Sequence, residues 1–392
     1  MLSKPQRTYH YGRQSISEDD IVAVIETLRA DMISQGEVLP DFERKVAEFC
    51  GAKYCLAVNS GTSALHIATK SLGLNNNDYG WTSAMSFVAS ANVIRYTGAS
   101  VDFLDISPKT FNITPEILSA KLEKAASQKR LPRVIIPVHF AGQSCEMSEI
   151  AALAARYDIA IIEDACQAMG GSFNGNRVGD CRFSNAVCFS LHPVKSITSG
   201  EGGLVLTNDR DLFEKMALLR THGVARGANV MQDVGPWHTE MQTDGYNYRI
   251  TEFQCALGRS QLKRLEEFVA KRQRLATHYR HRLENIPQIR LQQVDRPEDH
   301  AWHMMLVLFD FEAIGKSKKE VHADFRERGV NLNMHYYPIH LNPFYQDLYG
   351  FSEGDFPEAE KYWRSAFTFP LHVELEETDV DYICDCVEEI VT

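Results

Sequence analysis

The stretch FSLHPVKSITSGEGG, residues 189–203, places Lys195 in a loop rich in Ser, Thr, Gly and Pro, directly after a short apolar run. A lysine held in a partly dry pocket has a lowered pKa and becomes nucleophilic, as Schiff-base chemistry requires. The alternative is an ordinary lysine in a solvated loop. Lys195 by itself therefore leaves both interpretations open.

Two other stretches carry residue types suited to binding an anion and a protonated ring. Residues 59–63, NSGTS, stand between an apolar run and a helical pattern. Gly61 permits a close backbone approach, Thr62 offers a hydroxyl, and the helix start offers free N–H groups, which together suit a phosphate; an ordinary N-cap turn is the alternative. Asp164 ends another apolar run, so its carboxylate needs a partner such as a protonated ring nitrogen, or else caps the next turn.

Each of the three stretches follows an apolar run that we predict to be a strand. We predict strands at residues 54–58, 100–106, 133–140, 159–164, 185–191 and 203–208, and helices between them at 63–73, 86–98, 115–127 and 147–157. Nearly continuous apolar runs suit strands that are buried on both faces, so a parallel or mixed sheet flanked by helices is expected. Ligands of such sheets bind at the carboxyl ends of the strands.

We predict further helices and a strand before and after this region of alternating strands and helices. A capping-box pattern at Ser17–Asp20 opens a helix, and a second helix covers residues 39–50 and stops at Gly51. A long helical pattern covers residues 251–283. Beyond it we predict a strand at 303–309, a helix at 318–329 and an acidic helix at 376–391. We place a domain boundary in the long helix, giving domains of residues 1–255 and 256–392.

Composition narrows the class of protein. The chain has 392 residues, 44% hydrophobic and 24% charged, which suits a globular protein of two domains. Its net charge of -11 argues against nucleic acid and anionic membranes as partners. No signal peptide or membrane-spanning run is evident, and the nine scattered cysteines are interpreted as reduced thiols of a cytoplasmic protein. Cys384 and Cys386 are interpreted as filler rather than as metal ligands, and we expect no metal.

The three stretches together are the parts that pyridoxal 5'-phosphate (PLP) needs: a phosphate cradle, a carboxylate for the pyridine nitrogen and a lysine. Their order along the chain is that of the aspartate-aminotransferase fold (type I). We therefore predict this α/β fold, with a mixed, mostly parallel seven-stranded sheet and a smaller C-terminal α+β domain.

Motifs spread over almost the whole chain carry a family resemblance. They read NSGTSALHIA, SFVASANVI, VHFAGQSCEM, IIEDACQAMGG, FSLHPVKSITSGEGG, RTHG and GYNYRITEFQCALGRSQL, and they resemble the DegT-type nucleotide-sugar aminotransferases. The lead-in to the aromatic of the second motif, NNNDYGWTSAMSF, departs from the family's usual pattern. The resemblance implies a PLP enzyme that works as a homodimer.

The resemblance also implies roles for individual residues. Lys195 would bond covalently to PLP, Asp164 would pair with the pyridine nitrogen, and Gln167 would hydrogen-bond the ring's 3-hydroxyl. Phe87 would stack on the ring, unless it is a core aromatic. Asn247 would reach the phosphate from the neighbouring subunit. The other phosphate contacts would come from Gly61, Thr62 and Ser190.

A second group of residues would contact the substrate. His192 would hydrogen-bond substrate or phosphate, or else pack at the strand end. His335 and Tyr336 lie where family members line the sugar pocket. Arg226 and Arg249 are candidates for the diphosphate of a sugar nucleotide, with a structural role as the alternative for each.

The family's chemistry sets the expected reaction. L-glutamate would be the amino donor and a 4-keto nucleotide sugar the acceptor. HFAG, FSLHPVK and GEGG are most similar to members that aminate UDP-4-keto-6-deoxy-N-acetyl-beta-L-altrosamine in the pseudaminic acid pathway. UDP-4-keto-arabinose and GDP-4-keto-6-deoxymannose stay open as alternative acceptors. A PLP-binding regulator without turnover and a PLP-independent protein that binds nucleotide sugars stay open as alternative classes.

Overall fold

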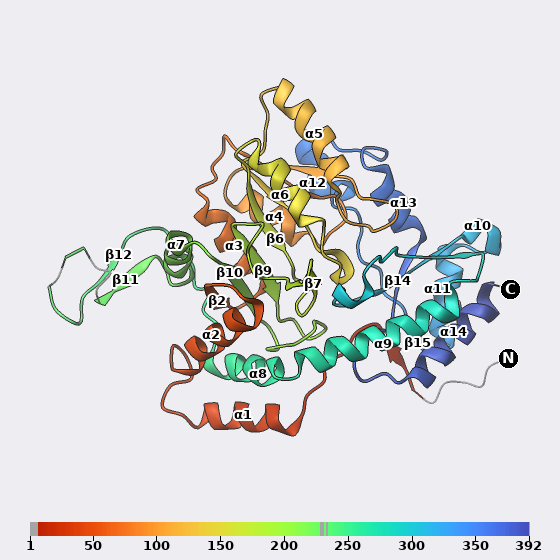
Figure 1. Ribbon diagram of the computed structural model, residues 1–392, viewed down its shortest axis with the longest axis horizontal. Coiled ribbons are helices and arrows are strands. Elements are labelled where there is room, and N and C mark those ends of the chain that lie inside the picture. Colours follow the sequence, from red (N-terminus) through yellow and green to blue (C-terminus); the bar gives the residue numbers. More distant parts are fainter. Residues whose placement is uncertain (1–6, 228–230, 233, 392) are drawn as a thin grey trace.

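A seven-stranded sheet organises the larger part of the protein in the computed structural model, which describes residues 7–227, 231–232 and 234–391 (Figure 1). Its strand order is β2-β10-β9-β6-β5-β3-β4. Strand β10 runs antiparallel to both of its neighbours, and the other pairs are parallel. The predicted mixed, mostly parallel sheet is confirmed. The strands are β2 (Tyr54–Val58), β3 (Tyr79–Ser83), β4 (Ser100–Leu104), β5 (Val134–Ile136), β6 (Ala160–Asp164), β9 (Ala186–Ser190) and β10 (Gly203–Thr207).

Helices bury both faces of this sheet, which explains why its strands are apolar at successive positions. In β2, Leu56 and Val58 join one core cluster, whereas Cys55 and Ala57 join another on the opposite face. The first face is covered by α3 (Gly61–Ser71), α4 (Ala89–Tyr96) and α7 (Arg210–Arg220). The second is covered by α2 (Val38–Cys50), α5 (Pro115–Ser127), α6 (Met147–Ala155) and α8 (Glu252–Leu262).

Strand β3 was not predicted, and it lies in the unusual NNNDYGWTSAMSF stretch. Its sequence, YGWTS, has no apolar run, so the usual strand signal is missing. It is nevertheless paired in parallel with β4 and β5. Trp81 is buried, and the hydroxyl of Thr82 donates to the carbonyl of Ile136, so a polar side chain is accommodated inside the sheet.

The first described segments of the chain pack against elements that come much later in the sequence. Strand β1 (Tyr9–His10) pairs with β15 (Val330–Asn331). The capping box predicted at Ser17 is confirmed at the start of α1 (Glu18–Leu28), which lies against α8. The outer side of α1 leaves large apolar side chains exposed, namely Ile21, Val22, Ile25 and Leu28.

A small hairpin projects from the body near α7. Its strands are β11 (Val224–Arg226) and β12 (Thr239–Met241), and Figure 1 shows it extending away from the sheet. Trp237 and Met241 in this segment are 79% and 66% exposed. A second short hairpin is formed by β7 (Ser172–Phe173) and β8 (Asn176–Arg177).

The C-terminal part contains a three-stranded antiparallel sheet of order β13-β14-β16. The single long helix predicted at residues 251–283 was wrong: α8 and α9 (Leu265–Leu283) are separate, and Arg264 between them leaves helical geometry and pairs with Asp20 of α1. The buried Cys384 and Cys386 belong to this part's core. The remaining elements are β13 (Ile289–Leu291), α10 (Phe311–Ile314), β14 (Met305–Phe309), α11 (Lys318–Glu327), α12 (Pro343–Tyr349), α13 (Pro357–Ser365), β16 (Ala366–Phe369) and α14 (Glu377–Val391).

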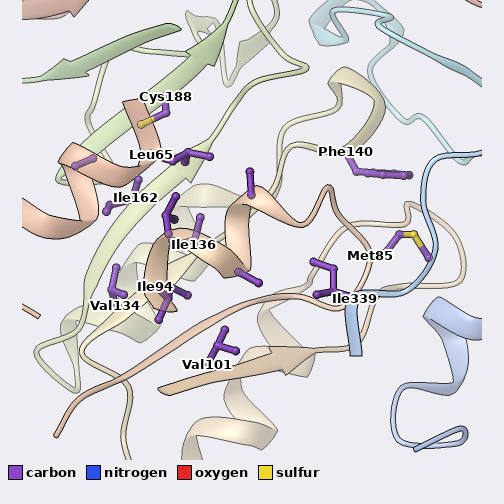
Figure 2. Packing of buried hydrophobic residues seen from close by; sticks show 14 of the residues in the cluster. Leu65, Met85, Ile94, Val101, Val134, Ile136, Phe140, Ile162, Cys188 and Ile339 are labelled. Carbon is purple, nitrogen blue, oxygen red and sulfur yellow. The ribbon is translucent and has the colours of Figure 1, made fainter. Parts of the chain in front are cut away.

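The two sheets share a core. Figure 2 shows Ile136 and Ile162 of the larger sheet in one cluster with Ile339 from the C-terminal part. The predicted division at 255/256 falls inside α8, and it stays a prediction. Within the described ranges, no helix has both the length and the apolar character needed to cross a membrane.

Candidate functional site

A cavity of about 640 Å³ opens at the carboxyl ends of β2, β6 and β9. Segments that follow these strands and the neighbouring β3 and β5 form one wall, and segments after β1, after β15 and before β14 form the opposite wall. All of the predicted site residues except Asn247, Arg226 and Arg249 line this cavity. Its volume lies in the range typical of small-molecule sites.

Lys195 points into this cavity, so the alternative of a solvated loop lysine does not fit. Its side chain is half-buried, and its Nζ lies 3.4 Å from Nε2 of His303. Burial lowers the pKa of Lys195, and the nearby Arg272 lowers it further, while the Asp164 carboxylate opposes the shift. A lysine with a lowered pKa in a cavity can act as a nucleophile and a base.

Asp164 occupies the last position of β6 and is 6% exposed. Its Oδ2 accepts a hydrogen bond of 2.6 Å from Oγ of Ser90, and its Oδ1 accepts one of 3.2 Å from the amide of Cys166. The carboxylate therefore caps the following turn and also lines the cavity. A buried carboxylate in this position can stabilise a cationic ring nitrogen.

Gln167 links the two walls of the cavity. Its Oε1 accepts a 2.7 Å hydrogen bond from the amide of Ala141, and its Nε2 donates to the hydroxyl of Tyr336 at 3.0 Å. Because both ends of the amide are held, its orientation is fixed before any ligand binds. The second N–H of Nε2 is left for a ligand acceptor.

The predicted phosphate cradle lies where α3 begins. Ser60 caps the helix through the amide of its third residue, which leaves the amides of Gly61 and Thr62 for an anion. A Cβ at Gly61 would lie 2.9 Å from Cβ of Ser190, and a Cβ at Gly203 would lie 2.1 Å from the carbonyl oxygen of Ser60. Both glycines are therefore required by the close approach of backbone segments around the cradle.

Phe87 is not a core aromatic, since its side chain is 55% exposed and lines the cavity. Its ring centroid lies 5.8 Å from that of Tyr336 across the cavity mouth. An exposed aromatic ring beside a buried carboxylate and lysine provides a flat surface for a planar ligand.

The predicted substrate residues take different positions. His192 is exposed at the cavity edge, so it is not packed at the strand end, and its partial burial lowers its pKa. His335 is 8% exposed, its Nδ1 lies 2.8 Å from Oγ1 of Thr368, and burial lowers its pKa to about 3. Burial also raises the pKa of Tyr336, so its hydroxyl stays protonated.

Arg226 and Asn247 lie outside the cavity of their own chain. Arg226 is exposed on the β11–β12 hairpin, and Arg249 is half-buried farther along the chain. Asn247 is exposed, and its carbonyl accepts a 3.4 Å hydrogen bond from Nδ2 of Asn59 at the cavity edge.

Sequence reasoning missed three residues near Lys195. His303 and Tyr11 line the cavity, and Arg272 is buried in α9 behind it. Arg272 interrupts the apolar stripe of α9, and His303 stands directly before the apolar run of β14. Polar residues in such positions are a usable signal, because burying them requires partners. Tyr11 gives no comparable signal.

These residues fit PLP. A lysine, a buried carboxylate, an exposed aromatic ring and a cradle that accepts no Cβ at Gly61 or Gly203 surround one cavity. The carboxylate suits the pyridine nitrogen, and the helix start suits the phosphate.

Comparisons with known proteins also indicate an aminotransferase. The model of the DegT/DnrJ/EryC1/StrS aminotransferase family matches residues 14–388. The chain is 34% identical to the spore coat polysaccharide biosynthesis protein SpsC of Bacillus subtilis, covering 100% of this chain and 99% of the relative. It is 32% identical to a UDP-4-amino-4,6-dideoxy-N-acetyl-beta-L-altrosamine transaminase of Campylobacter jejuni, covering 97% and 96%. The structure of Helicobacter pylori PseC, an aminotransferase involved in the biosynthesis of pseudoaminic acid, matches with a TM-score of 0.89 at 29% identity, covering 98% of this chain and 99% of that one.

Proposed function

The chain belongs to the DegT/DnrJ/EryC1/StrS family and is a PLP-dependent sugar aminotransferase, and on this premise we propose that it aminates the 4-keto group of a nucleotide sugar. The acceptor we favour is UDP-4-keto-6-deoxy-N-acetyl-beta-L-altrosamine, in a pathway of the pseudaminic acid type, with L-glutamate as the donor. The similarity to the Campylobacter jejuni transaminase supports this acceptor. The single observation that carries the proposal is Lys195 in one cavity with Asp164.

Lys195 moves the proton in the proposed reaction. PLP, when bound, supplies a protonated ring that draws electrons from the carbon whose proton is removed. With the cofactor bound, Nζ of Lys195 would accept the proton from the α carbon of glutamate and would return it at the cofactor's C4'. Its lowered pKa favours the neutral amine that this step needs. In the second half of the cycle, the same Nζ returns a proton to C4 of the sugar.

The other residues of the first wall hold and orient the cofactor. Asp164 keeps the proton on the ring nitrogen, and Gln167 donates from Nε2 to the ring hydroxyl. Phe87 covers one face of the ring and limits the access of water. The phosphate is bound by Gly61, Thr62 and Ser190.

The sugar nucleotide would bind against the opposite wall. His335 and Tyr336 offer neutral polar groups, which suit sugar hydroxyls better than phosphate. His192 at the exposed edge lies closer to solvent, where the rest of the nucleotide would extend. Arg226 of one subunit would bind the diphosphate of the sugar nucleotide in the cavity of the other subunit.

We propose a homodimer in which each subunit completes the other's site. Apolar side chains on α1 and on the hairpin are exposed in the single chain, which favours a second copy as their partner. Asn247 is exposed outside its own cavity, so its predicted phosphate contact would be made in the partner. A cytoplasmic location is part of this proposal. It is supported by the nine cysteines, because none of them forms a disulfide.

Mixing two inactive variants tests this arrangement. Chains with Lys195→Ala and chains with Asn247→Ala are unfolded together and refolded, so that mixed dimers form. If Asn247 acts in the partner, each mixed dimer has one intact site, and activity returns to roughly a quarter of that of the unmodified enzyme. Activity that stays at the level of the separate variants would contradict the shared site.

A panel of 4-keto sugars tests the acceptor. The enzyme is incubated with glutamate and each of UDP-4-keto-6-deoxy-N-acetyl-beta-L-altrosamine, UDP-4-keto-arabinose and GDP-4-keto-6-deoxymannose, and the aminated products are identified by mass spectrometry and NMR. We expect the first acceptor to have the highest kcat/KM. The higher identity to SpsC, a protein of polysaccharide biosynthesis, is the observation that favours a different sugar, and a preference for another acceptor would support that second candidate.

A further inference from the structure

His303 is a buried cavity residue to which none of the roles above is assigned. It precedes β14, is 5% exposed, and its Nε2 lies 3.4 Å from Nζ of Lys195. Its other nitrogen, Nδ1, has no hydrogen-bond partner in the part of the chain that the structure describes. Buried polar atoms usually have partners, so this ring nitrogen calls for an explanation.

His300, another buried histidine nearby, also has one ring nitrogen without a partner in the described part of the chain, Nε2, but its tautomer is fixed. Nδ1 of His300 accepts a 2.8 Å hydrogen bond from the amide of Trp302, so its proton must be on Nε2. A partner that can only donate, such as a backbone amide, selects the tautomer of a histidine ring, whereas a hydroxyl or an amine does not. The hydroxyl of Thr368, 2.8 Å from Nδ1 of His335, therefore leaves the tautomer of His335 open. Because Nδ1 of His303 has no such partner, its Nε2 can either accept or donate.

The backbone of His303 is held even though its tautomer is not. Its amide donates to the carbonyl of Ala141 at 2.9 Å, and its carbonyl accepts from Nη1 of Arg272 at 3.4 Å. Arg272 is 2% exposed and also donates to the carbonyl of Leu371 at 2.6 Å. The ring is therefore kept beside Lys195 by main-chain contacts.

We propose that His303 is a positioning residue that holds Nζ of Lys195, in both its charged and its neutral form, whenever this amine is not bonded to the cofactor. The ammonium donates to Nε2. After the ammonium loses its proton to solvent, the amine can still donate to Nε2, and it accepts from Nε2–H once the ring proton has moved from Nδ1 to Nε2 by exchange with solvent. This inference rests on the proposed role of Lys195. A lysine that bonds to a cofactor and is released in every cycle needs a fixed position for its Nζ while it is released.

The charges around the pair are consistent with a neutral imidazole. Burial, followed by Lys195 and Arg272, lowers the pKa of His303 well below its ordinary value, and His335 and His192 act in the same direction. Asp164 and Cys166 face Lys195 from the end of β6. The ammonium form of Lys195 therefore gains more from His303 than the amine does, because a charge-assisted hydrogen bond is the stronger of the two.

The test measures Lys195 directly, in the cofactor-free enzyme and without substrate. The rate at which an acylating reagent labels Lys195 is followed by mass spectrometry from pH 6 to pH 11, which gives the midpoint of its titration. His303→Leu removes the hydrogen bond and keeps apolar bulk, whereas His303→Gln keeps a donor and an acceptor near the position of Nε2. His300→Gln is the matched control, since His300 is equally buried but does not line the cavity.

We expect the midpoint in His303→Leu to fall by about half to one pH unit, and His303→Gln and His300→Gln to stay close to the unmodified protein. An unchanged midpoint in His303→Leu, or an equal shift in His303→Gln, would overturn the proposal. If His303→Leu does not fold, ¹⁵N shifts of His303 in the unmodified and Lys195→Ala proteins decide: we expect the tautomer ratio to change when the amine is absent, and an unchanged ratio contradicts the proposal. Because no acceptor sugar is used, a wrong sugar assignment leaves these results unaffected.

Discussion

The two walls of the cavity are built in different ways. Asp164 and the cradle at Gly61 come directly from strand ends of the large sheet, and Lys195 lies in the loop after β9. The opposite wall, with His303 and Tyr336, comes from irregular segments beside the smaller sheet. The first wall carries the charged groups, whereas the second carries imidazole and phenol side chains that burial keeps neutral.

This difference indicates a division of labour between the walls. A carboxylate, an amine and helix amides suit a charged cofactor that stays bound through every cycle. Neutral hydrogen-bonding groups suit the hydroxyls and carbonyl of a sugar that must enter and leave. Changes on the first wall should therefore damage both half-reactions, and changes on the second should act mainly on the sugar.

Removing the amine of the first wall should have the largest effect. Lys195→Ala is expected to lower turnover by about four orders of magnitude, because no other group in the cavity combines a lowered pKa with this position. Release of 2-oxoglutarate from glutamate measures it, and circular dichroism checks the fold. Lys318→Ala is the matched control: burial lowers the pKa of Lys318 to about 8, but it lies outside the cavity. Borohydride reduction should fix the cofactor to residue 195 and not to residue 318, and the reverse labelling would refute the assignment.

Asp164→Asn should have the next largest effect, a loss of about two to three orders of magnitude in both half-reactions. An amide holds a proton on the ring nitrogen less well than a carboxylate does. The adjacent Glu163 offers a control with equal burial, since it bonds to His139 and Ser184 instead of lining the cavity. Glu163→Gln should lower the free energy of unfolding by about 2 kcal/mol and leave the rates nearly unchanged. Equal loss of rate in Asp164→Asn and Glu163→Gln would contradict the proposed role of Asp164 in keeping the ring nitrogen protonated.

The difference between the walls also explains how much the sequence could predict. Strands β2, β6 and β9 are apolar runs, so the residues that follow them could be assigned to one edge of a sheet. Gln167, Phe87 and Asn247 had no such signal and came from the family resemblance. The strand β3 escaped prediction because its polar and glycine positions resemble a loop.

The second wall could not be assembled from local patterns. His303 and Tyr336 meet Lys195 and Gln167 across sequence separations of 108 and 169 residues. Which of their side chains face the cavity depends on how the smaller sheet packs on the larger one, and periodicity carries no information about that packing. The break between α8 and α9 was missed for a related reason, since it accompanies the contact of Arg264 with α1.

A smaller effect is expected at the cradle. Gly61→Ala places a methyl group 2.9 Å from Cβ of Ser190, so the backbone must shift, and we expect the Kd for PLP to rise roughly tenfold to a hundredfold. Gly73→Ala, at the other end of α3, has open space around it, and its strained φ of 75° should lower only stability, by about 1 kcal/mol. Absorbance titrations give both constants. Pyridoxal without its phosphate should bind both variants alike; if Gly61→Ala weakens pyridoxal as much as PLP, the cradle does not bind the phosphate.

The smallest effect is expected for Tyr336→Phe, which tests the role of the second wall. Tyr336→Phe removes the hydroxyl to which Nε2 of Gln167 donates at 3.0 Å, a loss of about 1 kcal/mol or three- to tenfold in rate. If this wall contacts the sugar, kcat/KM for the keto sugar should fall by this factor, while the half-reaction with glutamate changes less. Stopped-flow absorbance separates the two half-reactions. Tyr345→Phe is the control, because its buried hydroxyl donates to Oδ1 of Asn92 at 2.7 Å and does not line the cavity. Equal losses in both half-reactions of Tyr336→Phe would show that Tyr336 acts on the cofactor through Gln167, and the two walls would then form a single functional unit.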